Sequence, residues 1–216
     1  MRHSQDTHVD VSSTEPSRSF TLPSDRLREL AASIHPSRFA ARLDPLLSPP
    51  TRLRLQQSSR LQPRLAELLL GNDVDVSGAG WNDDLLLGHD PSRMALLAGS
   101  IWHARSVLKL VSRRDLSILV EMIGAEAHAF GIRHLSDAVA TTPIADPEEL
   151  SRQIEHDGLG CLGAWLDRVP ALERTRVLLR LPVGTAADDP AAEYRSAAGP
   201  LLSLVIAHLG TEVARG

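Results

Sequence analysis

Residues 89–111, "HDPSRMALLAGSIWHARSVLKLV", constrain the fold more than any other segment. Asp90 is suited to accept hydrogen bonds from the first free N–H groups of a helix. Pro91 suits the first helical position, where no N–H is needed. The apolar residues return at steps of three and four: Met94, Leu97, Ala98, Ile101, Leu108 and Val111. Because this spacing places the side chains on one face, the segment predicts a long amphipathic helix.

A second helix is expected to follow almost without a linker. Ser112 and Asp115 have the spacing of a capping box, with Asp in place of the usual Glu. The apolar face of this helix would continue through Leu116, Leu119, Val120 and Ile123. Gly124 is placed to break or bend it. Two helices joined so directly are expected to form an antiparallel hairpin.

The rest of the chain also has helical patterns and no long alternating segment typical of a strand. Helical patterns occupy residues 24–34, 35–45, 61–71, 146–157, 158–169, 170–182 and 194–210, the last with a kink expected near Pro200. Aromatic residues make up only 3% of the chain, and Leu and Ala dominate its apolar residues, which suits helices better than sheets. We therefore predict an all-α fold, a single irregular multi-helix domain over residues 24–216.

The N-terminal segment and the bulk composition narrow the class of protein further. Residues 1–23 are rich in Ser, Thr, Asp and Arg and contain too little apolar surface to order themselves, which predicts a disordered tail. The formal net charge is −4, and no apolar run approaches the roughly 20 residues that span a bilayer. With Cys161 as the single cysteine, a disulfide framework is excluded. We expect a cytoplasmic protein.

Two motifs could suggest an enzyme, and both favour a structural role. "GLGCLG", residues 158–163, matches the glycine spacing of a dinucleotide-binding loop, but a charged helical segment precedes it where that loop requires a strand. Its glycines are expected to allow close helix packing, with Trp165 as an anchor. Cys161, between Leu159 and Leu162, is expected to be a small buried hydrophobic residue. The sequence thus predicts no catalytic or cofactor-binding residue, and no enzyme.

The candidate metal-binding groups are the histidines and residues 73–84. No two histidines have the three- or four-residue spacing that places two ligands on one helical face. The spacing of residues 73–84 nearly matches a calcium-binding EF-hand loop, with candidate ligands Asp73, Asp75, Ser77 and Asp84. However, the normally apolar eighth position is Gly80, and the twelfth is Asp84 rather than Glu. We expect residues 72–89 to be a polar connection anchored by Trp81, without useful calcium affinity; whether it binds a cation stays open.

Several segments carry a resemblance to a known family. They are "IHPSRFAARLD", "LLAGSIWHARSVLKLVSRRDLSILVEMIG", "GLGCLGAWLDRVP", "VLLRLPVGT" and "GPLLSLVIAHL". Over roughly residues 30 to 210 the chain resembles the K subunit of bacterial type III secretion systems, the SctK/YscK family. The resemblance implies an all-helical adaptor of the sorting platform at the cytoplasmic face of the inner membrane. The adaptor would link the cytoplasmic domain of the inner-membrane ring protein to the Q subunit, which holds the L stator and the N ATPase. No catalytic residues are carried over.

The alternative is a helical DNA-binding regulator, suggested by the helix pair around Arg113 and Arg114. A mildly acidic chain is poorly suited to phosphate binding, which disfavours this alternative and predicts no nucleic-acid partner. We expect Arg105, Arg113, Arg114 and Arg133 to be exposed to solvent, with some of them in contact with a partner protein.

Overall fold

The computed structural model describes residues 24–70, 86 and 88–213, and its regular elements are all helical. No strand occurs among these residues, which confirms the all-α class. The predicted tail, residues 1–23, lies outside the described residues, as do Trp81 and the calcium-like spacing of residues 73–84. Within the described part, no helix is both long and apolar enough to cross a membrane.

Five helices of the described residues, α2, α3, α5, α7 and α9, begin after a residue whose side chain caps them. The α-helices of the described residues are α1 (Ser24–Ser33), α2 (Pro36–Ala41), α3 (Pro49–Gln57), α4 (Gln62–Leu70), α5 (Pro91–Trp102), α6 (Ala104–Lys109), α7 (Arg113–Ile123), α8 (Ala125–Arg133), α9 (Pro147–Leu166), α10 (Ala171–Leu179) and α11 (Arg195–Val213). Two short 3-10 helices are η2 (Leu135–Asp137) and η3 (Ala192–Tyr194). Asp90 and Ser112 each accept a backbone hydrogen bond as N-caps, as predicted, and Asp146 does the same for α9.

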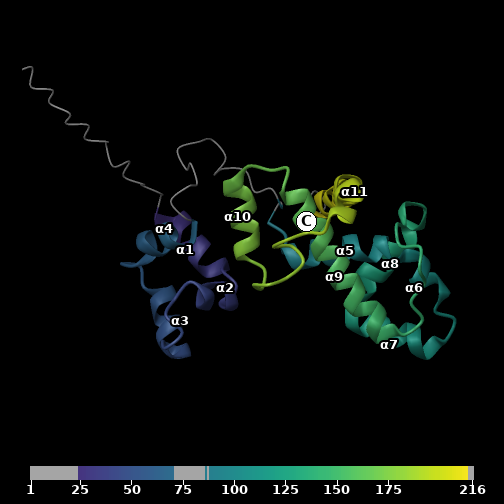
Figure 1. Ribbon diagram of the computed structural model, residues 1–216, viewed down its shortest axis with the longest axis horizontal. Helices are drawn as coiled ribbons and strands as arrows, with labels where there is room; N and C mark the ends of the chain where they lie inside the picture. The colour runs from purple at the N-terminus through teal and green to yellow at the C-terminus, as the bar shows by residue number, and fades with distance from the viewer. Residues whose placement is uncertain (1–23, 71–85, 87, 214–216) are drawn as a thin grey trace, which may run out of the picture.

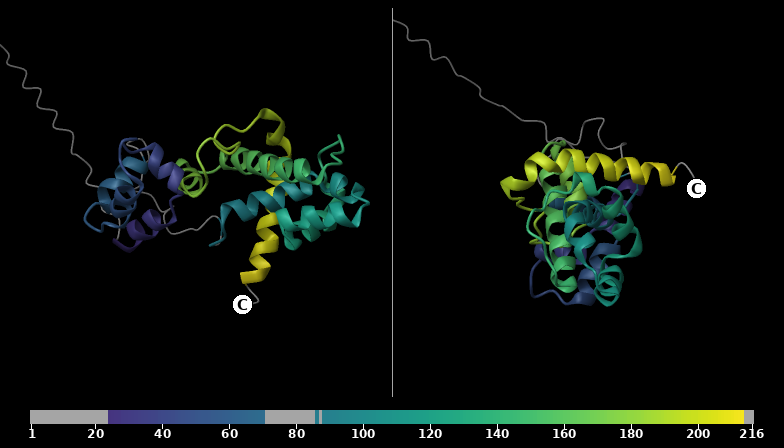
Figure 2. Two further views of the ribbon diagram at one scale, coloured as in Figure 1. Left: turned by 90° about the horizontal axis from the view of Figure 1, so that it is seen from below. Right: turned by 90° about the vertical axis from the view of Figure 1, so that its right-hand side faces the viewer.

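The buried apolar side chains form two clusters that follow one another along the longest axis of the molecule. The smaller cluster joins α1, α2 and α4 to one side of α10. The larger is built mainly from α5, α7, α8, α9 and α11. Figure 1 shows α1–α4 at one end, α6–α8 at the other and α10 between them. In Figure 2, α11 crosses α9 at a steep angle. The prediction of a single domain over residues 24–216 stays a prediction.

The closest contact in the larger cluster is the antiparallel crossing of α5 and α9. Here Gly99 faces the backbone of Ile154, and Gly158 faces the backbone of Ala95, with no room for a side chain on either glycine. Gly160 leaves space for the Tyr194 ring. The glycines of "GLGCLG" therefore lie inside one continuous helix, α9, and serve packing, as the sequence predicted.

Two predictions about the central helices are wrong. The long helix over residues 89–111 is interrupted at His103, because the carbonyl oxygen of Trp102 accepts hydrogen bonds from the N–H groups of Val139 and Ala140 (3.3 and 3.0 Å). The interruption changes the register, so that Leu108 and Val111, expected in the apolar face, are exposed.

The predicted antiparallel hairpin also does not form. Gly124, with a φ of 84°, separates α7 from α8, and α8 packs against α5. The start of α8 is paired with the start of α5 through Glu126 and Arg93, while Gly131 near its end approaches Ser100. These contacts advance in the same direction along both helices, so α5 and α8 run roughly parallel.

Arg38 joins the two clusters. Its guanidinium donates from Nε to the carbonyl oxygen of Leu181 (3.0 Å) and from Nη2 to that of Pro182 (2.9 Å), and it forms an ion pair with Asp188 (2.6 Å). The backbone N–H of His35, the N-cap of α2, donates to the carbonyl oxygen of Leu179 (2.8 Å). The start of α2 is thus bound to the end of α10 and the loop that follows.

Replacing Arg38 with methionine should weaken the connection between the two clusters, which we call the joint. Methionine keeps much of the apolar stem but removes the guanidinium contacts, and we expect a loss of about 2–3 kcal/mol of stability. Hydrogen exchange should accelerate in α1–α4 more than in α5 and α9. Arg42→Met, at an exposed position at the end of the same helix, is the control and should change little. Equal effects of the two substitutions would contradict the role assigned to Arg38.

Candidate interaction surfaces

A buried polar cluster connects three elements in the larger group of helices. His103, at the α5–α6 break, bonds through Nε2 to Oδ2 of Asp157 on α9 (2.6 Å). The hydroxyl of Tyr194, from η3, donates to Oδ1 of the same carboxylate (2.8 Å). His103 and Tyr194 are only 4% and 3% exposed. The tilted rings of Trp102 and Tyr194, with centroids 5.3 Å apart, cover the cluster.

The electrostatics of this cluster favour a charged Asp157. Burial alone would raise the pKa of Asp157, but hydrogen bonds from His103 and Tyr194 and the nearby histidine charges lower it. Burial, followed by the hydrogen bond to Asp157, raises the pKa of Tyr194. Tyr194 therefore stays protonated and acts as a donor. The arrangement fixes the relative positions of the α5–α6 break, α9 and η3.

Cys161 lies fully buried in α9, as predicted for a small hydrophobic residue. Burial, with a smaller contribution from the Asp157 charge, raises the pKa of its thiol to about 12. A thiol with such a pKa is almost entirely protonated at neutral pH and is a poor nucleophile.

We expect Cys161 in the native protein not to react with an aromatic disulfide reagent at pH 8 over an hour. The same protein in denaturant should react with one equivalent, because Cys161 is the single cysteine of the chain. Rapid reaction of the native protein would contradict the burial described here. Cys161→Ala, which cannot react, gives the spectroscopic baseline.

Two of the described histidines, His134 and His208, pack against the ring of Phe130. His208 bonds to Glu126 (3.3 Å), which also pairs with Arg93, and His134 lies 3.6 Å from Asp137. Among the residues that the structure describes, no three His, Cys, Asp or Glu side chains gather in a way that could hold a metal ion.

Apart from Val183, the exposed large apolar side chains of the described residues lie in two segments, residues 46–68 and 108–122. At one end they form the surface that we call the α2–α4 surface: Leu46, Leu53, Leu61 and Leu68. Beside Leu53 lies an open groove of about 590 Å³ between α1, α3 and α4. The sequence did not predict α3, because no residue of that helix is buried and it therefore lacks an apolar face. Its N-terminal signal, Ser48 before Pro49, was present.

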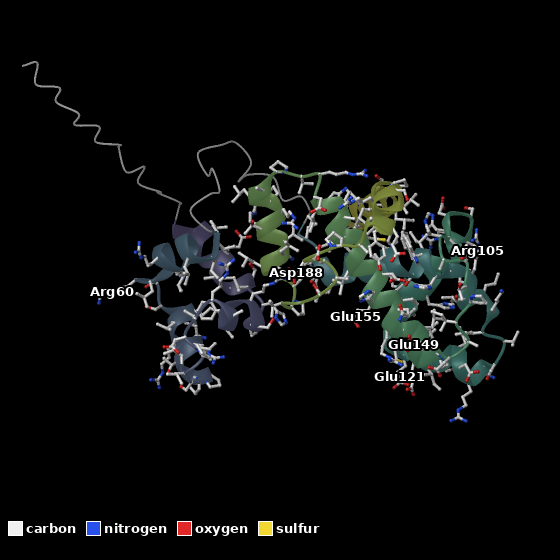
Figure 3. The ribbon with its side chains drawn as sticks, viewed as in Figure 1. Arg60, Arg105, Glu121, Glu149, Glu155 and Asp188 are labelled. Carbon is white, nitrogen blue, oxygen red and sulfur yellow. The ribbon has the colours of Figure 1, made fainter. Side chains whose placement is uncertain are left out.

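At the other end, α6, the turn after it and the start of α7 form a second surface, the α6–α7 corner. Leu108 is 57% exposed and Val111 97% exposed. Around them lie four exposed basic residues: Arg105, Lys109, Arg113 and Arg114. Figure 3 shows Arg105 and Arg60 at opposite ends of the long axis, with Asp188 between them. Arg133 is also exposed, so the predicted exposure of all four arginines, Arg105, Arg113, Arg114 and Arg133, is confirmed.

Fold and surfaces together define an elongated all-helical protein with exposed apolar side chains at both ends. The chain is 64% identical over 204 residues to nodulation protein NolU of Sinorhizobium fredii (strain NBRC 101917 / NGR234) and to nodulation protein NolU of Rhizobium fredii. In both cases the match covers 94% of this chain and 96% of the relative. The chain belongs to the NolU family of nodulation proteins. No family model and no solved structure matches it.

Proposed function

We propose that this protein is a non-enzymatic adaptor of a type III secretion sorting platform. It would link the cytoplasmic domain of the inner-membrane ring protein to the Q subunit, at the cytoplasmic face of the inner membrane. The resemblance of residues 30 to 210 to the K subunit supports this role. Because the relatives are named nodulation proteins, we place the adaptor in a secretion apparatus that acts during nodulation.

The observation that carries the proposal is the separation of the α2–α4 surface from the α6–α7 corner. A connecting protein needs two contact surfaces far enough apart for both partners to bind at once. Exposed apolar side chains are costly in water unless they become covered, and large ones gathered together indicate contact with another protein. Helices α3 and α4, which carry Leu53 and Leu68, lie at one end of the long axis, and α6, which carries Leu108, lies at the other.

The adaptor proposal is tested by mixing the purified full-length protein with the Q subunit and with the ring protein's cytoplasmic domain. We expect each to bind separately and both together in a ternary complex with an additive mass by light scattering. Leu53→Glu should abolish binding of one partner and Val111→Glu that of the other, while each variant keeps the remaining partner. Binding to neither partner, together with intact secretion in a deletion strain, would refute the proposal. The DNA-binding alternative gains no support from the NolU relationship.

A further inference from the structure

We propose that the α6–α7 corner binds an acidic patch on a partner protein. This inference rests on the proposed adaptor function, because it assumes that a protein binds the corner. It adds that the bound surface of that protein is acidic. The corner consists of the exposed residues Arg105, Leu108, Lys109, Val111, Arg113 and Arg114.

Its charge is opposite to that of the whole chain. Residues 105–114 contain four basic residues and no acidic one, whereas the chain carries a formal charge of −4. Some basic side chains elsewhere are held in ion pairs: Arg38 pairs with Asp188, and Arg152 with Glu149. Within the described part of the chain, the four basic side chains of the corner have no ion pair or side-chain hydrogen bond. They are available for a partner's carboxylates.

The placement of two of these residues does not serve the stability of the helix. Arg113 and Arg114 occupy the first two positions of α7. The N-terminus of a helix carries partial positive charge, so acidic residues are favoured there and basic residues disfavoured. The second residue of α9 is the acidic Glu148, where α7 has Arg114, although both helices have an acidic third residue, Glu149 and Asp115. The arginines of α7 are therefore better explained by an external anion than by folding.

The apolar residues of the corner distinguish a protein partner from other anions. Leu108 and Val111 lie among the four basic residues, an arrangement that matches interfaces with an apolar centre and a polar rim. A DNA duplex is bound through roughly 6–10 phosphate contacts, more than four side chains supply. An interfacial membrane helix needs a long apolar face, whereas α6 has only six residues. The corner therefore fits a compact acidic patch best.

The test is a charge reversal, R113E/R114E, in the full-length protein. Because acidic residues are favoured at the start of a helix, this variant should fold at least as well as the wild type, so lost binding cannot be attributed to unfolding. Arg195→Glu is the matched control: Arg195 is also exposed and also begins a helix, α11. The measurement is the Kd for the partner whose binding Val111→Glu abolishes, at 50 and 200 mM salt.

We expect R113E/R114E to raise this Kd by at least about tenfold and Arg195→Glu by less than about twofold, with the wild-type affinity weakening at the higher salt. An unchanged Kd for R113E/R114E while the wild type binds would overturn this inference and leave the adaptor proposal standing. Wild-type protein that binds neither partner would overturn both. The wild type could also bind phosphatidylglycerol vesicles or duplex DNA. If R113E/R114E abolished that binding and left protein binding unchanged, the corner would be assigned to those polyanions instead.

Discussion

Replacing Gly99 or Gly158 with alanine should unfold much of the larger group of helices. The new methyl group would overlap with the carbonyl oxygen of Ile154 in the first case and of Ala95 in the second. These are backbone atoms of a packed helix, so they cannot move aside as the end of a side chain can. We expect each substitution to lower the free energy of unfolding by more than about 3 kcal/mol, a large share of the 5–15 kcal/mol typical of a domain. Urea denaturation followed by circular dichroism measures the loss.

Gly199→Ala is the control for both substitutions. Gly199 also lies inside a helix, α11, but the nearest atom to an added methyl group is Nη1 of Arg168 at 3.2 Å, at the flexible end of a side chain. Alanine favours the helical backbone more than glycine does, but the ring of the following Pro200 opposes this gain, so the variant should change the free energy of unfolding by less than about 1 kcal/mol. If all three variants lost similar stability, the effect would come from glycine loss in general and not from the α5–α9 contact.

Replacing Asp157 with alanine is expected to have the second large effect. The substitution leaves two buried polar side chains, His103 and Tyr194, without their shared acceptor. Each buried polar group left without its partner usually costs about 1–3 kcal/mol. Asp157→Asn keeps an oxygen that accepts from the Tyr194 hydroxyl, so it should lose less. Equal stability of wild type and Asp157→Ala would contradict the role of the cluster.

The pH dependence of this effect follows from the lowered pKa of Asp157. In the unfolded chain an Asp has a pKa near 3.9, and in the native protein the value lies below it. The stability that the charged carboxylate contributes is therefore fully present above the unfolded pKa and is lost as the pH falls through the native one. We expect the stability difference between wild type and Asp157→Asn to shrink as the pH falls below about 4.

Local signals in the sequence were sufficient to predict most helix starts. An N-cap such as Asp90 or Asp146 acts on N–H groups within three residues, so its effect can be read without knowledge of the fold. The interruption at His103 could not be predicted, because it depends on hydrogen bonds between Trp102 and residues 139–140. The direction of α8 relative to α5 likewise depends on contacts between distant segments, such as Arg93 with Glu126.

The α6–α7 corner and the polar cluster around Asp157 were predictable to different degrees. The exposure of the arginines followed from charge alone, since an unpaired guanidinium is rarely buried. The apolar periodicity of residues 94–101 predicts that Leu108 and Val111 are buried, but both are exposed. The helix is interrupted at His103, and no residue in the sequence indicates this interruption. The polar cluster around Asp157 was not predicted at all. Its members come from three separate segments, and no spacing in the sequence relates them.

The joint between the two clusters has a consequence for how this protein can evolve. Arg38 and the N–H of His35 bind main-chain carbonyl oxygens of residues 179, 181 and 182. Every amino acid supplies the same carbonyl group, so mutations at those three positions change the side chains and leave the acceptors in place. These three positions can therefore change, within what the neighbouring core allows, without loss of the hydrogen bonds, whereas the ion pair needs the carboxylate of Asp188. Selection would act on Arg38 far more strongly than on the residues whose backbone it binds.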